Sequence, residues 1–363
     1  MKRHFQETRL ISQDLIKGKK VFVATSGGVD SSVTAALLRD AEADCTGIFM
    51  IVHDHAQQHR DDAQTIAKDL GIKFEALDLR NDFKLVLDYF SNQYKKARTP
   101  NPCVFCNRNI KFGILFDYAR SKGADFFATG HYASILRDDT GAYLYAGETE
   151  KDQSYALAMI NRSILPYLIF PLGDFNKTQT RQLAKKLGIS VSDKADSQEI
   201  CFIPDNNYAG RLEQLSPEVV KSGNIIDSSG KILGQHSGIH HFTIGQRRGI
   251  RVAMGTPWYV TKLDSDTNTV TLGPGDELIH KTLIASNPNW LIDTPKEPFA
   301  AKIKIRYNHK AVGGTVFPQG DSVKVVFDQP LRAITPGQAV VFYLDMPQGK
   351  KVAGGAWIDK AMD

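Results

Sequence analysis

The stretch Lys20-Val21-Phe22-Val23-Ala24-Thr25-Ser26-Gly27-Gly28-Val29-Asp30-Ser31-Ser32 decides the fold of this chain. Its first six residues form an apolar run typical of a buried strand, and the two glycines predict a turn. Val33, Ala36 and Leu37 then follow at helical spacing. Strand and helix patterns continue to alternate as far as Gly188, which predicts a doubly wound parallel sheet, an α/β fold with helices on both faces.

Further elements of this first region are expected from periodicity and from glycine or proline stops. The predicted strands lie at residues 46–52, 74–77 and 125–129, and the predicted helices at 31–40, 60–70, 82–96, 109–121 and 177–187.

The pattern changes after about Pro204, where Gly, Ser and Asp become frequent. Residues 258–263 and 269–272 are predicted to form a hairpin. Strands at 301–307, 322–327 and 339–344 alternate with period two, which indicates a small closed β-barrel. The predicted domains are therefore an α/β catalytic domain (1–204), a small connecting module (205–278) and an all-β C-terminal barrel (279–363).

Composition excludes several classes of protein. The 363 residues are 42% hydrophobic and 23% charged, with a net charge of +5 and 4 cysteines. These values exclude a disordered chain, a collagen-like chain and a disulfide framework. Neither an apolar run long enough to span a bilayer nor a secretory apolar segment is present in the sequence, so we expect a cytoplasmic protein with no membrane partner. The basic balance is compatible with a nucleic-acid partner.

The turn after the first predicted strand has the chemistry of a phosphate site. Gly27 and Gly28 allow close backbone approach, and the following helix offers unpaired N–H groups. Ser31 and Ser32 add hydroxyl donors, and Asp30 could contact Mg²⁺. The alternative is a plain strand–helix turn with Asp30 or Ser31 as helix cap. No lysine lies in the turn, so it is not a G-x-x-x-x-G-K-[ST] loop.

Cys103 and Cys106 form the second informative feature. Two prolines before them predict an extended loop. Between Gln93 and Phe116 there are five basic residues and no acidic one, surroundings that favour a reactive thiolate. The C-x-x-C spacing also fits half of a zinc site, but the remaining cysteines, Cys45 and Cys201, supply no second pair.

Cys201 follows a polar loop and lies inside an apolar run, so it is either a reactive thiol or a buried core residue. Cys45 lies inside an apolar predicted strand, and for this thiol we expect burial in the core.

The Ser-Gly-Gly-Val-Asp-Ser loop resembles the loop of the N-type ATP pyrophosphatases, which cleave ATP between the α and β phosphates. Taken together, the motifs along the chain resemble those of the tRNA-specific 2-thiouridylases, from about Lys20 to Ile358. These motifs are Pro100-Asn101-Pro102, Cys106-Asn107, Ile110-Lys111-Phe112, Ala128-Thr129-Gly130-His131-Tyr132-Ala133, Lys151-Asp152-Gln153-Ser154-Tyr155, Ser197-Gln198-Glu199-Ile200-Cys201-Phe202-Ile203, Phe242-Thr243-Ile244-Gly245-Gln246-Arg247-Arg248-Gly249, Arg306-Tyr307 and Pro336-Gly337-Gln338.

The resemblance implies ATP-dependent 2-thiolation of the wobble uridine, position 34, of tRNA. It implies ATP and Mg²⁺ as cofactors, and tRNA and a sulfur-relay donor protein as partners. Cys201 would carry a persulfide, and Cys106 would be the second catalytic cysteine, able to pair with Cys201 as a disulfide. Products would be AMP and pyrophosphate.

The resemblance also assigns further residues. ATP would contact Ala24, Thr25, Ser26, Gly27, Gly28, Val29, Asp30, Ser31, Ser32, Met50 and Gly130, with Asp30 catalytic and a contact for Mg²⁺. The target base would meet Asn101, Pro102 and Cys103. The rest of the tRNA would contact His131, Lys151, Asp152, Gln153, Arg306, Tyr307 and Gln338.

Alternatives stay open at this point. The chain could be an ATP pyrophosphatase acting on a small molecule, although such an enzyme needs no cysteine pair, or a non-catalytic tRNA-binding protein. Cys103 could replace Cys106: in a helix the two thiols would share a face, whereas in an extended loop they would point apart. His131 could be a satisfied strand-end histidine, and Arg306 and Tyr307 could be ordinary surface residues.

Overall fold

The structure is a computed structural model that describes residues 13–189, 200–203, 205–250, 252 and 255–363. Contacts divide the chain into two compact units. The first comprises the described parts of Met1–Lys84, Cys106–Gln198 and Asp345–Val352, and the second those of Leu85–Phe105, Glu199–Leu344 and Ala353–Asp363. Pro204, the predicted domain boundary, lies outside the described residues, as does the Ser197-Gln198-Glu199 part of the motif before Cys201.

A five-stranded parallel sheet forms the centre of the first unit, in the order β3-β2-β1-β4-β7. Its strands are β1 Lys20–Ala24, β2 Asp44–Ile51, β3 Lys73–Asp78, β4 Phe126–Thr129 and β7 Leu168–Ile169. The α/β prediction is therefore confirmed. The chain runs from β1 outward to β3 and then returns to β4 on the other side of β1, so β1 and β4 flank a switch point where such sheets bind ligands.

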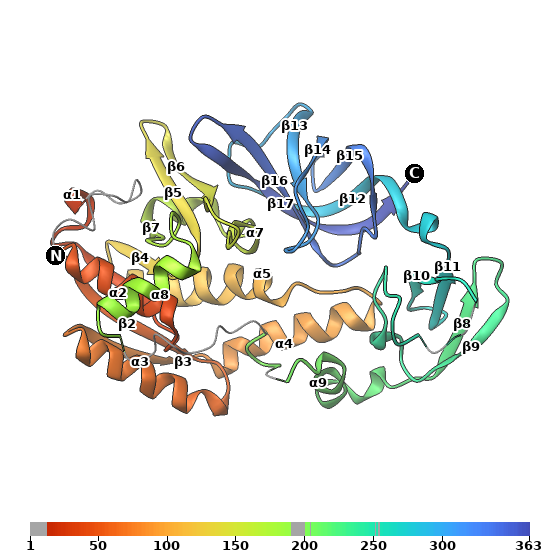
Figure 1. The fold of residues 1–363 in the computed structure, drawn as a ribbon, viewed down its shortest axis with the longest axis horizontal. Helices are drawn as coiled ribbons and strands as arrows, with labels where there is room; N and C mark the ends of the chain where they lie inside the picture. The colour runs from red at the N-terminus through yellow and green to blue at the C-terminus, as the bar shows by residue number, and fades with distance from the viewer. Residues whose placement is uncertain (1–12, 190–199, 204, 251, 253–254) are drawn as a thin grey trace. The chain divides into compact units, whose positions relative to one another are not determined.

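Helices surround this sheet (Figure 1). They are α1 Gln13–Ile16, α2 Val29–Asp40, α3 Gln57–Asp69, α6 Phe116–Ser121, α7 Ser154–Leu157 and α8 Lys177–Lys186, with the short turns η1 Asp54–Ala56 and η3 Arg162–Tyr167. α2 is buried along most of its length, and Val33, Leu37 and Leu38 pack into the core of the unit. An unexpected hairpin of β5 Ala133–Asp138 and β6 Gly141–Ala146 follows β4, and its Tyr145 pairs with Lys351.

The segment carrying Cys103 and Cys106 differs from the sequence prediction. The extended loop ends at Asn101, and helix begins at Pro102, not at residue 109. It runs through α5 Pro102–Cys106 and the π-helical η2 Asn107–Leu115 into α6. Proline fits the first position of a helix because its missing N–H needs no partner there. The two thiols therefore stand three residues apart on a helix and share a face.

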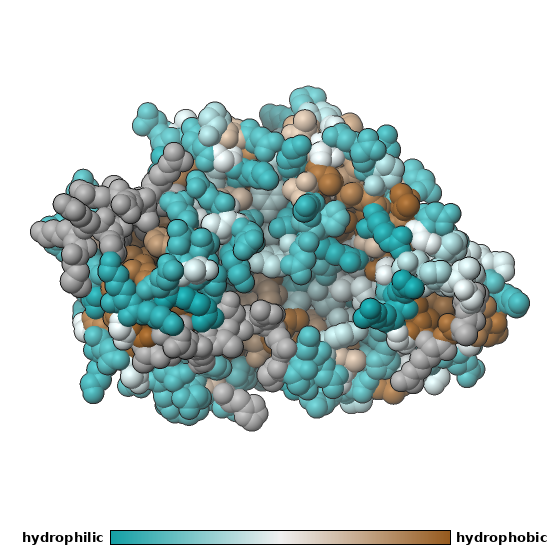
Figure 2. Space-filling view, in the orientation of Figure 1, coloured by the Kyte–Doolittle hydropathy of each residue, from teal (hydrophilic) through white to brown (hydrophobic). Residues whose placement is uncertain are grey.

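The second unit begins with most of α4 Arg80–Lys95 and contains a four-stranded sheet in the order β10-β11-β8-β9. These strands are β8 Gly223–Asp227, β9 Ile232–His236, β10 Tyr259–Asp264 and β11 Thr269–Gly273, and the accompanying helices are α9 Tyr208–Leu215, η4 Pro217–Val219, η5 Ile239–His241 and η6 Gly275–Leu278. β10 and β11 are antiparallel, as predicted. Apolar surface shows over this sheet in Figure 2. Ile232, the first residue of β9, is 61% exposed.

The strands after Leu278 form a closed barrel, as predicted. They are β12 Ile279–Trp290, β13 Phe299–Lys304, β14 Val312–Gln319, β15 Ser322–Arg332, β16 Ala339–Met346 and β17 Gly349–Met362. Their order is β12-β15-β14-β13-β16-β17, and β17 pairs back onto β12 to close the ring. Alternate residues such as Val323, Val325 and Phe327 fill the interior. Within the described residues, none of the helices has the length and apolar character needed to cross a bilayer.

Candidate active site

The turn between β1 and α2 has the backbone that the two glycines predict. Gly27 has φ +69°, and a Cβ atom there would lie 2.5 Å from the carbonyl oxygen of His59. Only glycine satisfies both conditions. Gly28 is extended, with φ −106°, and a Cβ there would lie 3.3 Å from Ser26 Oγ. Gly28 is therefore not required by the local conformation, which fits a role in leaving room beside the backbone.

Serine hydroxyls fold this turn onto the first turn of α2. Ser31 Oγ accepts from the backbone N–H of Ser26 at 3.1 Å, and Ser32 Oγ donates to the carbonyl of Gly28 at 2.8 Å. Gly28 occupies the N-cap position with no side-chain capping bond. The alternative of a plain turn capped by Asp30 or Ser31 is therefore not what the chain forms, and the helix start keeps its donors for another acceptor.

Asp30 of α2 contacts a residue that follows β4 and a residue of α8. Its Oδ1 accepts from the Tyr132 hydroxyl at 2.8 Å and from Lys177 Nζ at 2.7 Å. Lys177 is the first residue of α8, whose start is fixed by a capping box between Asn176 and Gln179. The sequence analysis missed Lys177 because it lies 147 residues from Asp30. The capping residues Asn176 and Gln179 indicate from sequence that a helix starts at Lys177. They do not indicate that Lys177 contacts Asp30.

The other predicted ATP residues lie on the same sheet. A Cβ on Gly130 would approach the carbonyl carbon of Asp30 and the nitrogen of Ser31 to 2.9 Å, so glycine lets the end of β4 pack against α2. Thr25 N–H donates to Ile48 O at 2.8 Å, and Met50 lies two residues further along β2. All of these positions lie at or just beyond the carboxyl ends of β1, β2 and β4, where ligands bind in open parallel sheets.

His131 is held in a largely apolar environment. Its Nδ1 lies 2.6 Å from Thr129 Oγ1, and its ring is 5.7 Å from Phe112 and 6.0 Å from Phe170. Burial, with a smaller effect from the positive charge of Lys111, places the pKa of His131 well below its usual value. The imidazole is therefore neutral at physiological pH, and any contact with tRNA would be a hydrogen bond, not an ion pair.

The Lys151-Asp152-Gln153 motif serves the local fold through two of its side chains. Asp152 accepts from the backbone N–H groups of Gly147 at 3.0 Å and Ser154 at 2.9 Å. Gln153 brackets Tyr132: its Oε1 accepts from Tyr132 N–H at 3.1 Å, and its own N–H donates to Tyr132 O at 2.8 Å. These bonds tie the start of α7 to the residue that contacts Asp30.

The four cysteines differ in burial. Cys45 is buried, as expected, and burial raises the pKa of its thiol to about 12. Cys103 and Cys201 are exposed and Cys106 is half-buried, so Cys201 is not a core cysteine. Its neighbour Phe202 is the anchor: the ring packs edge-on to Phe90 of α4 at 5.4 Å. Within the described residues, the zinc alternative finds no group of three metal-ligating side chains that includes a cysteine.

The C-terminal site residues fall into two kinds. Arg306 donates to Ala333 O at 2.8 Å, to Ile244 O at 3.3 Å and to the Thr335 hydroxyl, so its guanidinium joins strands and loops within the second unit. Tyr307, by contrast, is 41% exposed. Gln338 is buried and hydrogen-bonded to Asn101 at 3.0 Å, which brings together two motifs that the sequence places 237 residues apart.

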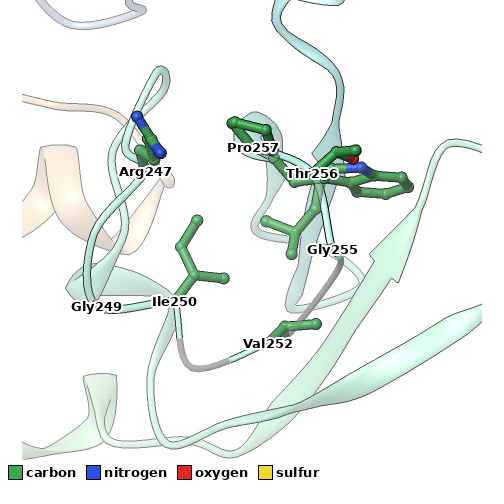
Figure 3. A pocket seen from close by; sticks show the side chains of 9 residues that line it. Arg247, Gly249, Ile250, Val252, Gly255, Thr256 and Pro257 are labelled. Atoms are coloured by element: carbon green, nitrogen blue, oxygen red, sulfur yellow. The ribbon is translucent and has the colours of Figure 1, made fainter.

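Two further features of the second unit lie outside these assignments. A cavity of about 380 Å³ is lined by Arg247, Ile250, Pro257 and Trp258 among others (Figure 3).

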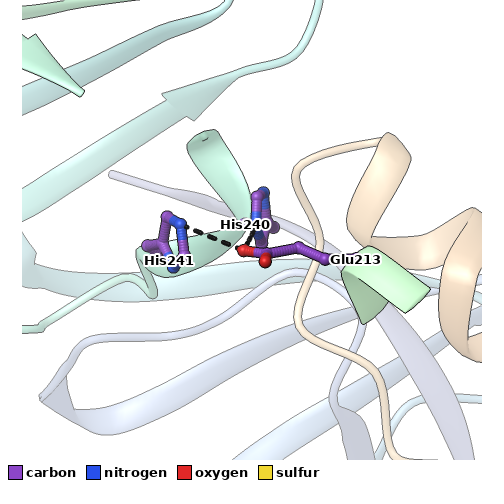
Figure 4. Close-up of side chains that lie close together, drawn as sticks. All are labelled: Glu213, His240 and His241. Carbon is purple, nitrogen blue, oxygen red and sulfur yellow. Dashed lines mark hydrogen bonds and ion pairs between the residues drawn. The ribbon is translucent and has the colours of Figure 1, made fainter. Parts of the chain in front are cut away.

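The second feature is a cluster of Glu213, His240 and His241, in which Glu213 Oε1 lies 3.0 Å from His240 Nε2 and 3.5 Å from His241 Nε2 (Figure 4). His240 Nδ1 is buried without an acceptor, whereas metal-bound histidines normally donate their second N–H. The cluster therefore fits a hydrogen-bonded contact between α9 and η5 better than a metal centre.

A parallel sheet with a glycine turn and an uncapped helix start at its switch point, followed by a small β-sheet and a closed barrel, defines a nucleotide-dependent enzyme of the HUP class. Family models match the chain in three parts. They are described as a tRNA methyl transferase HUP domain (residues 19–205), a tRNA methyl transferase PRC-barrel domain (213–274) and an aminomethyltransferase beta-barrel domain (280–358).

Full-length relatives identify the family more closely. The tRNA-specific 2-thiouridylase MnmA of Carboxydothermus hydrogenoformans is 44% identical, over 96% of this chain and 100% of its own length. The proteins of the same name from Halothermothrix orenii and Clostridioides difficile are 44% and 40% identical, over 93% and 96% of this chain and 98% and 100% of their own lengths. The chain belongs to the tRNA-specific 2-thiouridylase family, whose members are sulfurtransferases.

Proposed function

We propose that this chain catalyses ATP-dependent 2-thiolation of uridine 34 in tRNA, with Cys201 as the sulfur carrier. The observation that carries the assignment to Cys201 is the exposure of this residue beside the buried Phe202. A small-molecule ATP pyrophosphatase would need no such thiol, and a non-catalytic tRNA-binding protein would need neither thiol nor phosphate turn.

ATP would bind at the turn Ser26–Ser32, with Ala24, Thr25, Met50 and Gly130 around it. The uncapped N–H groups of α2 would receive phosphate oxygens, and Lys177 would add a positive charge beside them. The uridine O2 would attack the α-phosphorus, and pyrophosphate would leave with the electron pair of the broken P–O bond. The resulting O2-adenylated uridine is activated at C2 because AMP is a good leaving group.

Sulfur transfer would follow in two steps, attack on C2 and release of the thiolated base. The terminal sulfur of a Cys201 persulfide attacks C2, and AMP leaves with the former O2. Cys106 then attacks the Cys201 sulfur, so that the S–S bond to the transferred sulfur breaks and 2-thiouridine is released. A Cys106–Cys201 disulfide forms, and an external thiol reduces it before a sulfur-relay donor protein reloads Cys201.

Mg²⁺ would accompany the ATP phosphates, with Asp30 as a carboxylate contact beside the turn. Asp30 Oδ1 already accepts from Lys177 and Tyr132. In the described part of the chain, the one group of three metal-ligating side chains is Glu213, His240 and His241, away from this turn in the sequence. No step of the reaction is therefore assigned to a protein-held metal.

Asn101, Pro102 and Cys103 would meet the target base, close to the start of α5. The rest of the tRNA would contact His131, the Lys151-Asp152-Gln153 turn, Arg306 and Tyr307, with 11 Lys and Arg against 7 Asp and Glu from residue 279 to the end favouring phosphate. In this scheme residues 1–204 form the catalytic domain, 205–278 the connecting module and 279–363 the tRNA-binding barrel of a cytoplasmic enzyme.

The test is reconstitution with ATP, an unmodified tRNA transcript and a persulfide donor, followed by mass spectrometry of the nucleosides. We expect 2-thiouridine together with AMP and pyrophosphate. ADP and orthophosphate as products would contradict cleavage between the α and β phosphates. Affinity for tRNA should fall with salt, by a log–log slope of about −0.7 to −0.9 per neutralised phosphate. A chain truncated near residue 204 that kept full tRNA affinity would contradict the barrel's role.

A further inference from the structure

We propose that Gln338 and Arg98 are positioning residues that fix the start of the cysteine-bearing helix. They belong to a clasp, which we define as the loop Arg98–Asn101 together with residues 336–339 and 358–359 of the barrel. Every atom of the clasp lies in the second unit. The inference rests on the proposed function, because the position of α5 matters to catalysis only if its cysteines take part.

The side chain of Gln338 is fully engaged inside the clasp. Its Nε2 donates to the carbonyls of Thr99 at 3.0 Å and Pro100 at 3.2 Å, and its Oε1 accepts from Asn101 Nδ2 at 3.0 Å. The residue is only 9% exposed. Contact with a tRNA phosphate through this amide would break bonds already made, so we infer that Gln338 serves tRNA thiolation by holding the loop.

Backbone groups complete the grip on the loop. Ala339 N–H donates to Asn101 Oδ1 at 2.7 Å, and Thr99 N–H donates to Pro336 O at 2.9 Å. Gly337 has φ +89°, and a Cβ there would lie 2.8 Å from Thr99 O. The Pro336-Gly337-Gln338 motif therefore has a structural role. Its turn lies so close to the loop that only glycine fits at position 337.

Arg98 anchors the other end of the loop. Its Nη2 donates to Ile358 O at 2.8 Å and to Asp359 Oδ1 at 2.9 Å. Ile358 N–H in turn donates to Gln338 O at 2.9 Å. Arg98 and Gln338 thus hold the same loop through the same strand, β17, and their effects should be coupled.

The clasp ends where the reactive helix starts. Asn101 N–H donates to the Tyr89 hydroxyl at 3.3 Å, and the Tyr89 ring stacks on Phe105 at 4.1 Å with an interplanar angle of 6°. Phe105 lies between Cys103 and Cys106 on this helix. Since a misplacement of about 1 Å can cost about 100-fold in rate, a loosened clasp should slow sulfur transfer without weakening tRNA binding.

The experiment compares full-length Gln338→Met, Arg98→Met and the double variant with wild type. Gln319→Met is the matched control, because it makes the same chemical change at an exposed position at the end of β14 of the same barrel. For each protein we would measure the tRNA dissociation constant and its salt slope, the single-turnover rate of thiolation, and amide hydrogen exchange of the peptide covering residues 98–106.

We expect both clasp variants to thiolate at least about tenfold more slowly, with tRNA affinity and salt slope within about twofold of wild type. Hydrogen exchange at 98–106 should rise. The thiolation rate of the double variant should fall by a smaller factor than the product of the two single-variant factors. Weaker tRNA binding with unchanged exchange would overturn the proposal in favour of direct contact, and behaviour equal to Gln319→Met would overturn it outright.

Hydrogen exchange keeps this test separate from the proposed function. Exchange reports on the clasp whether or not the enzyme is active, and a Gln338→Met protein that does not fold leaves Arg98→Met as an independent probe of the same loop. A wild-type protein that makes no 2-thiouridine would contradict the proposed function. Protection of 98–106 that depends on Gln338 and Arg98 would still stand in that case as a property of the fold.

Discussion

Lys177 Nζ lies 2.7 Å from Asp30 Oδ1 and joins the first residue of α8 to the first turn of α2. Both side chains are largely shielded from solvent, with 16% and 31% of their surfaces exposed. The phosphate turn of this chain contains no lysine. In the proposed ATP site, Lys177 would supply from another element the positive charge that a G-x-x-x-x-G-K-[ST] loop carries within itself. The pair also occupies Oδ1 of Asp30, the residue for which a Mg²⁺ contact is predicted.

Replacing Lys177 by Met should weaken ATP binding about tenfold, because the phosphates lose a cation and Asp30 keeps an unbalanced charge beside them. Isothermal titration with a non-hydrolysable ATP analogue measures this. Lys186→Met, at the exposed end of the same helix, is the control and should bind as wild type does. Equal affinity in Lys177→Met would show that the lysine acts on the fold alone.

Asp30→Ala should abolish thiolation while the protein still folds.

The two glycines of the turn should respond differently to substitution. Gly27→Ala should lower stability by at least about 1–2 kcal/mol, since its backbone is left-handed and a Cβ would meet His59 O. Gly28→Val should unfold near the wild-type temperature yet fail to bind ATP, because its side chain fills the approach to the phosphates. Thermal unfolding with and without ATP separates the two effects. A Gly28→Val protein that ATP stabilises normally would contradict the placement of the phosphates.

Cys201→Ser should bind ATP and tRNA but make no 2-thiouridine, because a hydroxyl cannot carry a persulfide. Cys106→Ser should also lose activity, whereas Cys103→Ser should retain it. Cys103 and Cys106 lie on one face of the same helix, so their positions along the helix do not show which of them reaches Cys201. Non-reducing peptide mapping of the oxidised protein decides the matter: a Cys103–Cys201 disulfide with an active Cys106→Ser enzyme would reverse the assignment.

His131 should remain neutral below pH 6.5, because burial lowers its pKa in the folded protein. The unfolded chain binds a proton there more readily, so the folded state loses stability as pH falls below about 6.5, by at most about 1.4 kcal/mol per pH unit. His131→Gln should flatten this part of the stability profile. NMR of histidine-labelled protein provides the direct check, and a His131 signal that titrates near pH 6.5 would contradict the neutral assignment.

Much of the architecture could be predicted from local sequence. The five-residue strand β1, the glycine turn and the helix α2 follow one another because apolar runs, glycine and 3.6-residue spacing act over short distances. The barrel strands were also predicted, since each alternates inward and outward residues along its own length. The hairpin β5–β6 was missed, although its strands pair in register from Ala133 to Ala146.

The sequence by itself determined the class of fold, the turn proposed to bind phosphate and the three cysteines proposed to act, because each depends on residue type and spacing within a few positions. Only the tertiary structure decided which side chains complete them. Lys177 and Asp30, or Gln338 and Asn101, meet across 147 and 237 residues. Many lysines and glutamines along the chain have the same chemistry, and only the packing of strands and helices selects the one that reaches its partner.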